Sequence, residues 1–175
     1  MTVDRGSLAK RVQERALLTG HFRLRSGTSS EKYFDKYLLE SDPALLRELA
    51  EALALLMPSD VDALAGLEMG GIPLVTLLGQ VTGLQTLFVR KAAKEYGTCR
   101  LAEGGEVMGR RLVVIEDVVT SGGQLLMSCA ELRRSGADLA VVLCLIDRER
   151  GGREALAADD LELRSLFTAT ALEAA

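Results

Sequence analysis

The sequence predicts one α/β domain with a central, mostly parallel sheet flanked by helices and a small N-terminal hood or flap. Two apolar runs, residues 112–115 and 139–143, are almost uninterrupted, as in strands buried on both faces of a sheet. Segments with helical spacing alternate with such runs, and this alternation is typical of parallel sheets covered by helices. Of the 175 residues, 48% are hydrophobic, so the chain can bury one core. We expect a single domain over residues 1–175, with about residues 1–40 forming the flap.

The first forty residues predict a helix followed by two short strands. Leu8, Val12 and Ala16 recur at fourfold spacing, which places them on one face of a helix. A Ser-Gly-Thr-Ser turn then separates two strand-like stretches. The predicted elements are a helix over residues 7–18, strands over 22–25 and 33–39, and a turn over 26–29.

From Asp42 onward, helices and strands are expected to alternate regularly. Asp42-Pro43 starts a helix, with aspartate as the N-cap and proline at the first helical position, and Pro58 stops it after about Met57. Beyond this helix, turns rich in glycine separate the apolar runs from the helical segments. The predicted elements are a strand over residues 63–67, a helix from the 70–73 turn to about 83, a strand over 85–90, a long loop over 91–109, a strand over 111–116, a helix over 122–134 and a strand over 140–146.

Composition argues against several classes of protein. A net charge of −4 is unlike that of a general nucleic-acid binder, which presents a basic face. No apolar run approaches the ~18 residues of a membrane span, and residues 1–6 lack the apolar core of a secretory signal. The three cysteines form no C-x-x-C pair, which favours a reducing, cytoplasmic setting over a disulfide scaffold or a zinc site. His21 is the single candidate for any mechanism that uses histidine.

The segment that carries the chemistry spans residues 116–124, with two acids, two apolar residues and then Thr-Ser-Gly-Gly before a helix. Open parallel sheets bind ligands at the carboxyl ends of their strands, and a helix N-terminus there offers free N–H groups to an anion. Gly122 and Gly123 let the backbone approach a phosphate closely, and the hydroxyls of Thr120 and Ser121 can donate to its oxygens. The segment therefore predicts a phosphate site.

The two acids need a different role, because carboxylates repel a phosphate. Sugar hydroxyls and a divalent cation are natural partners for Glu116 and Asp117. Thr-Ser-Gly-Gly alone would also fit a plain helix cap, but paired acids at a strand end are less common in a merely structural turn. The segment lacks the P-loop and dinucleotide patterns, so the predicted ligand is a sugar monophosphate rather than a nucleoside triphosphate.

On these residues the sequence resembles the type I phosphoribosyltransferases, whose signature is two acids followed by apolar residues and a Thr-containing, Gly-rich turn. The resemblance implies their fold and the binding of phosphoribosyl pyrophosphate (PRPP), with the acids on the ribose hydroxyls and the turn on the 5′-phosphate. The PRPP-binding residues that it implies here are Glu116, Asp117, Val118, Val119, Thr120, Ser121, Gly122, Gly123 and Gln124.

Three further stretches resemble the orotate phosphoribosyltransferase family. Residues 22–27, with Ser30 and the pair at 33–34, are similar to its orotate-binding flap. Residues 89–98 are similar to its mobile catalytic loop, and residues 146–149 to the strand end whose arginine grips the orotate carboxylate. The orotate-binding residues that the resemblance implies are Arg25, Tyr33, Phe34, Thr120 and Arg148; because side chains alternate along a strand, only one of Tyr33 and Phe34 should face the ligand.

The cationic loop and the arginine also make physical sense by themselves. Arg90, Lys91 and Lys94 place three cations within five residues, where they can stabilise the charge that a departing pyrophosphate gains. The alternative is a solvated basic surface loop. The Arg148 guanidinium matches a planar carboxylate with two parallel hydrogen bonds, and orotate carries such a carboxylate.

This sequence departs from the family pattern at three positions. Arg25 stands where many members have lysine, and Tyr96 where many have histidine. Gly70 falls where some members carry a pyrophosphate-binding lysine, so that contact is either absent or supplied by another cation.

The resemblance implies a Mg²⁺-dependent transfer of ribose 5-phosphate from PRPP to orotate, giving orotidine 5′-monophosphate and pyrophosphate in pyrimidine biosynthesis. Mg²⁺ would be held mainly by substrate oxygens and waters. Lys91, Asp117 and Lys94 are the implied catalytic residues, and Arg90 and Tyr96 complete the PRPP set. A homodimer that shares the 91–105 loop between subunits is also implied. Two alternatives stay open, a phosphoribosyltransferase for another base and a regulatory protein that senses PRPP.

Overall fold

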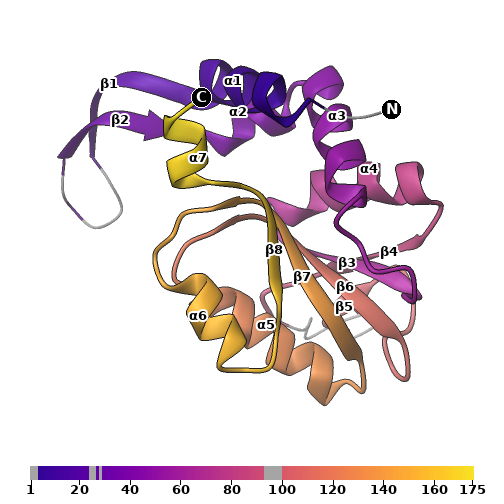
Figure 1. Ribbon diagram of the computed structural model, residues 1–175. Helices are drawn as coiled ribbons and strands as arrows, with labels where there is room; N and C mark the ends of the chain where they lie inside the picture. The colour runs from indigo at the N-terminus through magenta and orange to yellow at the C-terminus, as the bar shows by residue number, and fades with distance from the viewer. Residues whose placement is uncertain (1–3, 24–26, 28, 93–99) are drawn as a thin grey trace.

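The structure, a computed structural model, describes residues 4–23, 27, 29–92 and 100–175 of the chain. Six strands form its main sheet: β3 (Ala63–Leu67), β4 (Gln85–Val89), β5 (Ala102–Glu103), β6 (Arg111–Val119), β7 (Asp138–Asp147) and β8 (Leu163–Thr168). Their order is β5-β4-β3-β6-β7-β8, and all neighbours are parallel except β5, which pairs antiparallel with β4 (Figure 1). The predicted α/β fold with a mostly parallel sheet is confirmed.

Helices cover both faces of this sheet and divide the core into two halves. The helices are α1 (Arg5–Ala16), α2 (Lys36–Glu40), α3 (Pro43–Ala54), α4 (Gly71–Thr82), α5 (Gly123–Arg134), α6 (Gly152–Ala157) and α7 (Ala169–Glu173). Helices α3 and α4 pack on one face, and α5 and α6 lie together on the other (Figure 1). In β6, Val113 and Ile115 enter the first half of the core, while Leu112 and Val114 enter the second. This alternation explains why the run reads as continuously apolar.

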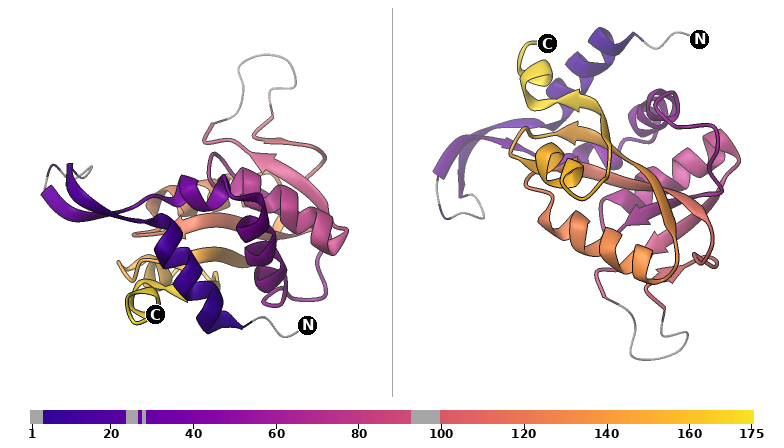
Figure 2. Two further views of the ribbon diagram at one scale, coloured as in Figure 1. Left: turned by 90° about the horizontal axis from the view of Figure 1, so that it is seen from above. Right: turned by 60° about the horizontal axis from the view of Figure 1, so that its bottom comes forward.

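The N-terminal part and the C-terminal helix form a hood on the sheet. Strands β1 (Leu17–Arg23) and β2 (Ser29–Phe34) make a separate antiparallel pair, which projects from the body of the molecule in both views of Figure 2. Helix α1 packs against α2 and α7, so the two ends of the chain meet in the hood. The Asp4 and Asp35 carboxylates cap the N-termini of α1 and α2.

Several predicted boundaries in the first half of the chain are wrong. The strand predicted over 33–39 ends at Phe34, because Asp35 caps a helical turn that buries Leu39. The helix that starts at Asp42-Pro43 ends at Ala54, three residues before Met57. The strands predicted over 22–25 and 140–146 are β1 and β7, and both begin earlier than expected.

The remaining errors lie around and after the phosphate segment. The long loop predicted over 91–109 contains β5. β6 runs through both acids to Val119 instead of stopping at Glu116. The sequence analysis assigned no element after Ile146, and so missed α6, β8 and α7.

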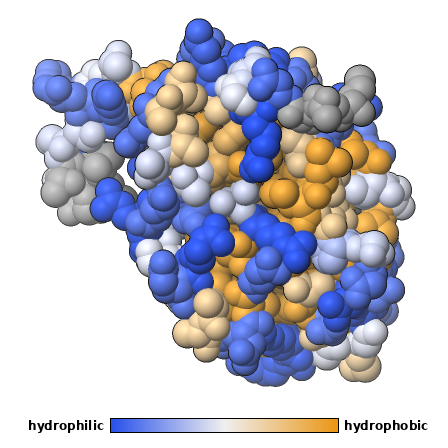
Figure 3. Space-filling view, viewed as in Figure 1, coloured by the Kyte–Doolittle hydropathy of each residue, from blue (hydrophilic) through white to orange (hydrophobic). Residues whose placement is uncertain are grey.

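On the face shown in Figure 3, hydrophobic residues lie in the middle and on the right, and hydrophilic residues surround and interrupt them. In the described ranges of the chain, no helix combines the length and the apolar character that a membrane crossing requires.

Candidate active site

Two neighbouring strands end at the candidate site, and their ends are in register. β6 and β7 are parallel, with Val119 paired with Asp147 at the end of the ladder. The Arg148 N–H donates to the Val119 carbonyl oxygen at 2.8 Å. Thr120 and Arg148, the residues that follow the two strands, are therefore neighbours at the edge where open parallel sheets bind ligands.

The phosphate side of the site is a cavity of about 410 Å³. It is bounded by the end of β6, by the turn that follows and by the start of α5. Gly122 is the N-cap of α5 and has a left-handed backbone with φ of +77°, and no side chain caps the helix. Its first N–H groups, at the positive end of the helix dipole, are thus available to an anion. The lining residues are Lys91, Glu116, Val118, Val119, Thr120, Ser121, Gly122, Gly123, Gln124 and Leu125.

The two acids point to opposite faces, because both belong to a strand rather than to the loop that follows it. Glu116 lines the phosphate cavity. Asp117 is only 2% exposed and lies on the other face. The resemblance implied the same ribose-binding role for both acids, but only Glu116 lines the cavity, although the two carboxyl groups still interact with each other.

Asp117 lies in a tight pocket between β6, the start of α4 and the hood helix α2. Its Oδ2 atom is 2.5 Å from the Lys36 Nζ atom, and its Oδ1 atom accepts the Val118 N–H at 2.6 Å. A Cβ atom placed on Gly70 would lie 1.9 Å from Oδ2, so only glycine fits beside this carboxylate as it stands. Asp117 Oδ2 and Glu40 Oε1 are buried without a hydrogen-bond partner among the described residues, and Lys36 meets Oδ2 as an ion pair.

Burial and mutual repulsion shift the charges of these acids. Burial, together with Asp117, raises the pKa of Glu116 to about 9 and that of Glu40 to about 8. Burial alone would also raise the pKa of Asp117, but Glu116, the Lys36 ammonium and Glu40 stabilise its charged form and lower that pKa. Near neutral pH the cluster therefore holds one carboxylate, one ammonium and two protonated acids. A protonated Glu116 can both donate to and accept from a sugar hydroxyl.

The acceptor side of the site brings Phe34 and Arg148 to one small cavity of about 80 Å³. This volume is far below the roughly 300–1,000 Å³ of a small-molecule site, so the cavity by itself would not hold a ligand. It shows only that Phe34 and Arg148 lie close together. Tyr33 points elsewhere, is 42% exposed and stacks on Phe22 with ring centroids 5.4 Å apart. The remaining lining residues are Gln13, Leu17, Ile146, Ala169, Leu172 and Glu173.

Arg148 is held from both sides by its neighbours, while its own side chain stays available. Asp147 is buried, and it accepts the Glu149 N–H at 2.9 Å and the Arg153 Nε–H at 3.1 Å. Glu149 Oε2 in turn accepts the N–H and the hydroxyl of Thr170, at the start of α7. Within the described residues, no acid forms an ion pair with the Arg148 guanidinium.

The sequence analysis missed α7 as a wall of this cavity, and it missed Lys36 and Glu40 altogether. Thr168 caps α7, and Thr is a preferred N-cap residue, so the helix start left a signal in the sequence. The role of Lys36 and Glu40 left no comparable signal, because it depends on where the hood meets the sheet.

The cations expected to hold pyrophosphate lie in different surroundings. Lys91 lines the phosphate cavity, and its backbone N–H donates to Glu68 Oε1 at 2.7 Å. Arg90 approaches Glu103, with 3.8 Å between Nε and Oε1, so the guanidinium is partly engaged in the sheet edge. Arg25, Lys94 and Tyr96 lie outside the described residues, and their roles stay predictions.

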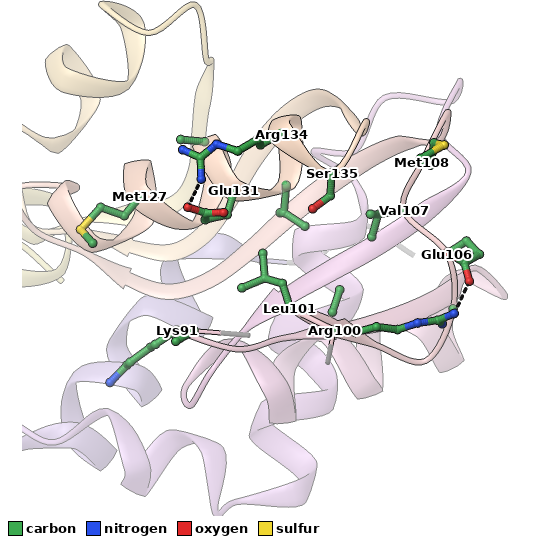
Figure 4. A pocket seen from close by; sticks show the side chains of 15 residues that line it. Lys91, Arg100, Leu101, Glu106, Val107, Met108, Met127, Glu131, Arg134 and Ser135 are labelled. Carbon is green, nitrogen blue, oxygen red and sulfur yellow. Dashed lines mark hydrogen bonds and ion pairs between the residues drawn. The ribbon is translucent and has the colours of Figure 1, made fainter. Parts of the chain in front are cut away.

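A larger groove of about 840 Å³ lies between α5 and the segment around β5 (Figure 4). Met108 and Met127 are exposed on it, and ion pairs join Arg100 to Glu106 and Arg134 to Glu131. Lys91 borders this groove as well, but in Figure 4 its side chain points away from Glu106 and Met108, which lie at the other end of the groove. The groove lacks the glycine turn and the free helix N-terminus, so we place the chemistry in the smaller phosphate cavity.

Comparison with known proteins agrees with this geometry. No family model matches the chain. An orotate phosphoribosyltransferase of a Nocardioides species is 48% identical over 175 residues, which is 100% of this chain and 97% of the relative. The solved orotate phosphoribosyltransferase of Mycobacterium tuberculosis in complex with PRPP has a TM-score of 0.84 at 27% identity, covering 98% of this chain and 99% of that one. The enzyme from Aeropyrum pernix has a TM-score of 0.81 at 34% identity, covering 95% and 97%.

The sheet and the phosphate loop define a phosphoribosyltransferase of type I, as the resemblance implied. Sequence identity of this size over the whole chain identifies the family within this fold. The chain belongs to the orotate phosphoribosyltransferase family.

Proposed function

We propose that the chain transfers ribose 5-phosphate from PRPP to orotate and releases pyrophosphate and orotidine 5′-monophosphate. One observation carries the proposal beyond family membership. The free N-terminus of α5 and the Arg148 guanidinium, which pairs with no acid of the described ranges, lie at the ends of adjacent strands. The hydrogen bond from Arg148 N–H to the Val119 carbonyl joins these ends. An anion site for a phosphate and a cation for a carboxylate are thus neighbours, as this pair of substrates requires.

In this proposal each substrate group has its own part of the site. The 5′-phosphate occupies the start of α5 and the hydroxyls of Thr120 and Ser121, and the ribose lies beside Glu116. The orotate carboxylate pairs with Arg148, and Phe34 flanks the ring. Tyr33 stacks on Phe22 and does not line the cavity beside Arg148.

The reaction breaks the bond between the ribose carbon and pyrophosphate, and forms a bond from that carbon to a ring nitrogen of orotate, which releases its proton to water. Pyrophosphate leaves with the electron pair, so the transition state has positive charge on the ribose and growing negative charge on the leaving group. Lys91, at the mouth of the phosphate cavity, stabilises that negative charge. The site contributes positioning and charge stabilisation and needs no covalent intermediate.

The residues present fit a Mg²⁺ ion carried by the substrate. In the described part of the chain no group of three or more acid, histidine or cysteine side chains could hold a metal ion. Oxygens of pyrophosphate and ribose, with waters, can supply the ligands instead, and the bound ion would neutralise part of the pyrophosphate charge.

Three further parts of the proposal rest on the sequence and on the family. Lys94 and Tyr96 would join Lys91 around pyrophosphate, and Arg25 would join Arg148 around orotate. The protein would act in the cytoplasm as a homodimer that shares the 91–105 loop between subunits.

A turnover assay tests the acceptor. Purified protein with PRPP and Mg²⁺ is offered orotate, uracil, hypoxanthine or adenine in parallel, and the loss of each base is followed. We expect turnover of orotate alone. Turnover of another base without orotate would overturn the acceptor, and PRPP binding without any turnover would favour a PRPP sensor.

A further inference from the structure

The hood helix α2 reaches the acid pair of the phosphate side. Lys36 and Glu40 are one helical turn apart on this helix, so they share a face. Lys36 Nζ lies 2.5 Å from Asp117 Oδ2, and Glu40 is close enough to interact with the same carboxylate. A segment some eighty residues away in the sequence thus supplies the cation for Asp117.

This cation balances a charge that would otherwise be buried alone. The side chain of Asp117 is 3% exposed, and that of Lys36 is 34% exposed. Glu116 and Glu40, the other titratable groups that interact with Asp117, are acids, and the start of α4 contributes the Gly70 backbone. Within the described residues Lys36 is therefore the one positive charge on this carboxylate, and a buried carboxylate without a partner is costly.

The Asp117 carboxylate braces the strand end that leads into the phosphate loop. Its Oδ1 atom accepts the Val118 N–H at 2.6 Å, while Glu116 Oε1 accepts the Asp117 N–H at 3.1 Å. Val118 is followed directly by Val119 and the phosphate turn. The position of Asp117 thus sets the backbone on which Glu116 and the turn are built.

Gly70 leaves the space in which this pair forms. A Cβ at Gly70 would overlap the Asp117 carboxylate, which Lys36 contacts at the same oxygen atom. A side chain at position 70 would therefore displace the carboxylate oxygen that Lys36 contacts. Glycine at this position leaves the Lys36–Asp117 pair as it stands.

We propose that Lys36 is a positioning residue for PRPP, which acts by holding Asp117 in place beneath the phosphate loop. This inference rests on the proposed function, because PRPP is the ligand whose site Asp117 supports. Lys36 does not itself touch the reacting atoms. Its loss weakens PRPP binding and leaves the chemical step nearly unchanged.

The test uses Lys36→Met, which keeps the apolar stem and removes the charge. We expect the KM for PRPP to rise about tenfold or more, as is typical when an orienting partner of a functional group is lost, with kcat within about threefold of the wild type. Lys36→Arg keeps the charge and should recover most of the loss. Lys10→Met removes an exposed lysine from α1 and should leave both constants unchanged.

A double-mutant cycle shows whether Lys36 acts through Asp117. In the background of Asp117→Asn, Lys36→Met should cause no further rise in the KM for PRPP, because the neutral amide needs no cation. The double variant leaves no unpaired buried charge, so it remains readable even if Lys36→Met alone folds poorly. The inference would be overturned if the two substitutions raised the KM for PRPP independently, so that their effects multiplied in the double variant. A fall in kcat of Lys36→Met as large as its rise in KM would also overturn it. An inactive wild type would instead refute the proposed function.

Discussion

The phosphate side and the acceptor side of the site are built in different ways. The phosphate side comes almost entirely from one segment, the end of β6 and the start of α5. The acceptor side gathers single residues from α1, β1, β2, β7 and α7 around Arg148. A local segment can carry its whole function in its sequence pattern, whereas an assembled wall depends on how distant elements pack.

The same contrast extends to the way each side is supported. The phosphate turn itself relies on backbone geometry, with a left-handed glycine at the N-cap of α5, and one ion pair, between Lys36 and Asp117, braces the strand before it. The acceptor side is held by side-chain bonds, among them Asp147 to Arg153 and Glu149 to Thr170. A substitution on one side should therefore weaken the binding of one ligand and leave the other ligand unaffected.

Arg148→Met should have the largest effect and should fall on orotate alone. Loss of a guanidinium that pairs with a carboxylate leaves the ligand charge unmatched, which costs roughly 2–5 kcal/mol. We expect the KM for orotate to rise by about a hundredfold or more, while the Kd for PRPP, measured by calorimetry, stays within about twofold. Arg150→Met, two residues along the chain and exposed, is the matched control. Equal losses for both ligands would mean that the two sides are not separate.

Gly122→Ala should have the opposite selectivity. Alanine at φ of +77° costs roughly 1–2 kcal/mol, since the left-handed region crowds a Cβ against the next carbonyl oxygen. The melting temperature and the affinity for PRPP should both fall, with the affinity for orotate little changed. Gly123→Ala tests the reasoning, because a Cβ there meets nothing within 4 Å and the position is helical. Gly123→Ala should be as stable as the wild type. An equal fall in the melting temperature of Gly122→Ala and Gly123→Ala would refute the strain argument.

The phosphate side was easier to predict from the sequence than the acceptor side. The sequence predicted the phosphate segment as one local unit, because acids, small hydroxyl residues and glycines follow one another over nine consecutive positions. All of these residues except Asp117 line the cavity, and their binding of PRPP stays a prediction. It misplaced the end of β6, since the strand was expected to stop at Glu116 and in fact continues through Asp117 to Val119. That error hid the fact that Glu116 lines the phosphate cavity and Asp117 does not.

The acceptor side and the hood were less predictable, for physical reasons. A strand over 33–39 was expected from the aromatic and apolar residues there, but the Asp35 cap turns the chain into α2. Only that turn brings Lys36 to Asp117. Likewise Gly152 packs where a Cβ would lie 2.4 Å from the Thr120 carbonyl oxygen, and no local pattern indicates such a contact between α6 and the phosphate turn.

Glu40→Gln tests the junction between the hood and the phosphate side through pH. Burial raises the pKa of Glu40 to about 8, above the ordinary 4.5 of a glutamate, so the folded state keeps a proton that the unfolded state has lost. Stability from this group is complete below pH 4.5 and is lost as the pH rises towards 8. Glutamine cannot ionise, so the variant should lose less melting temperature than the wild type between pH 5 and pH 8. Glu14→Gln, an exposed site on α1, should follow the wild type, and parallel curves for all three proteins would refute the burial of Glu40.

Glu149→Ala should have the smallest effect, confined to the acceptor side. Its carboxylate is exposed and accepts both the N–H and the hydroxyl of Thr170, at 2.8 and 2.7 Å, and these bonds keep its pKa below the usual range. The bonds dock α7 beside Arg148, and Leu172 and Glu173 of α7 line the same cavity. Without them α7 should fray, which would raise the KM for orotate by a few-fold and leave the KM for PRPP unchanged. Glu154→Ala, exposed on α6, should change neither constant. A rise in the KM for PRPP instead would show that α7 supports the phosphate side, and the division of the site into two independently held sides would then fail.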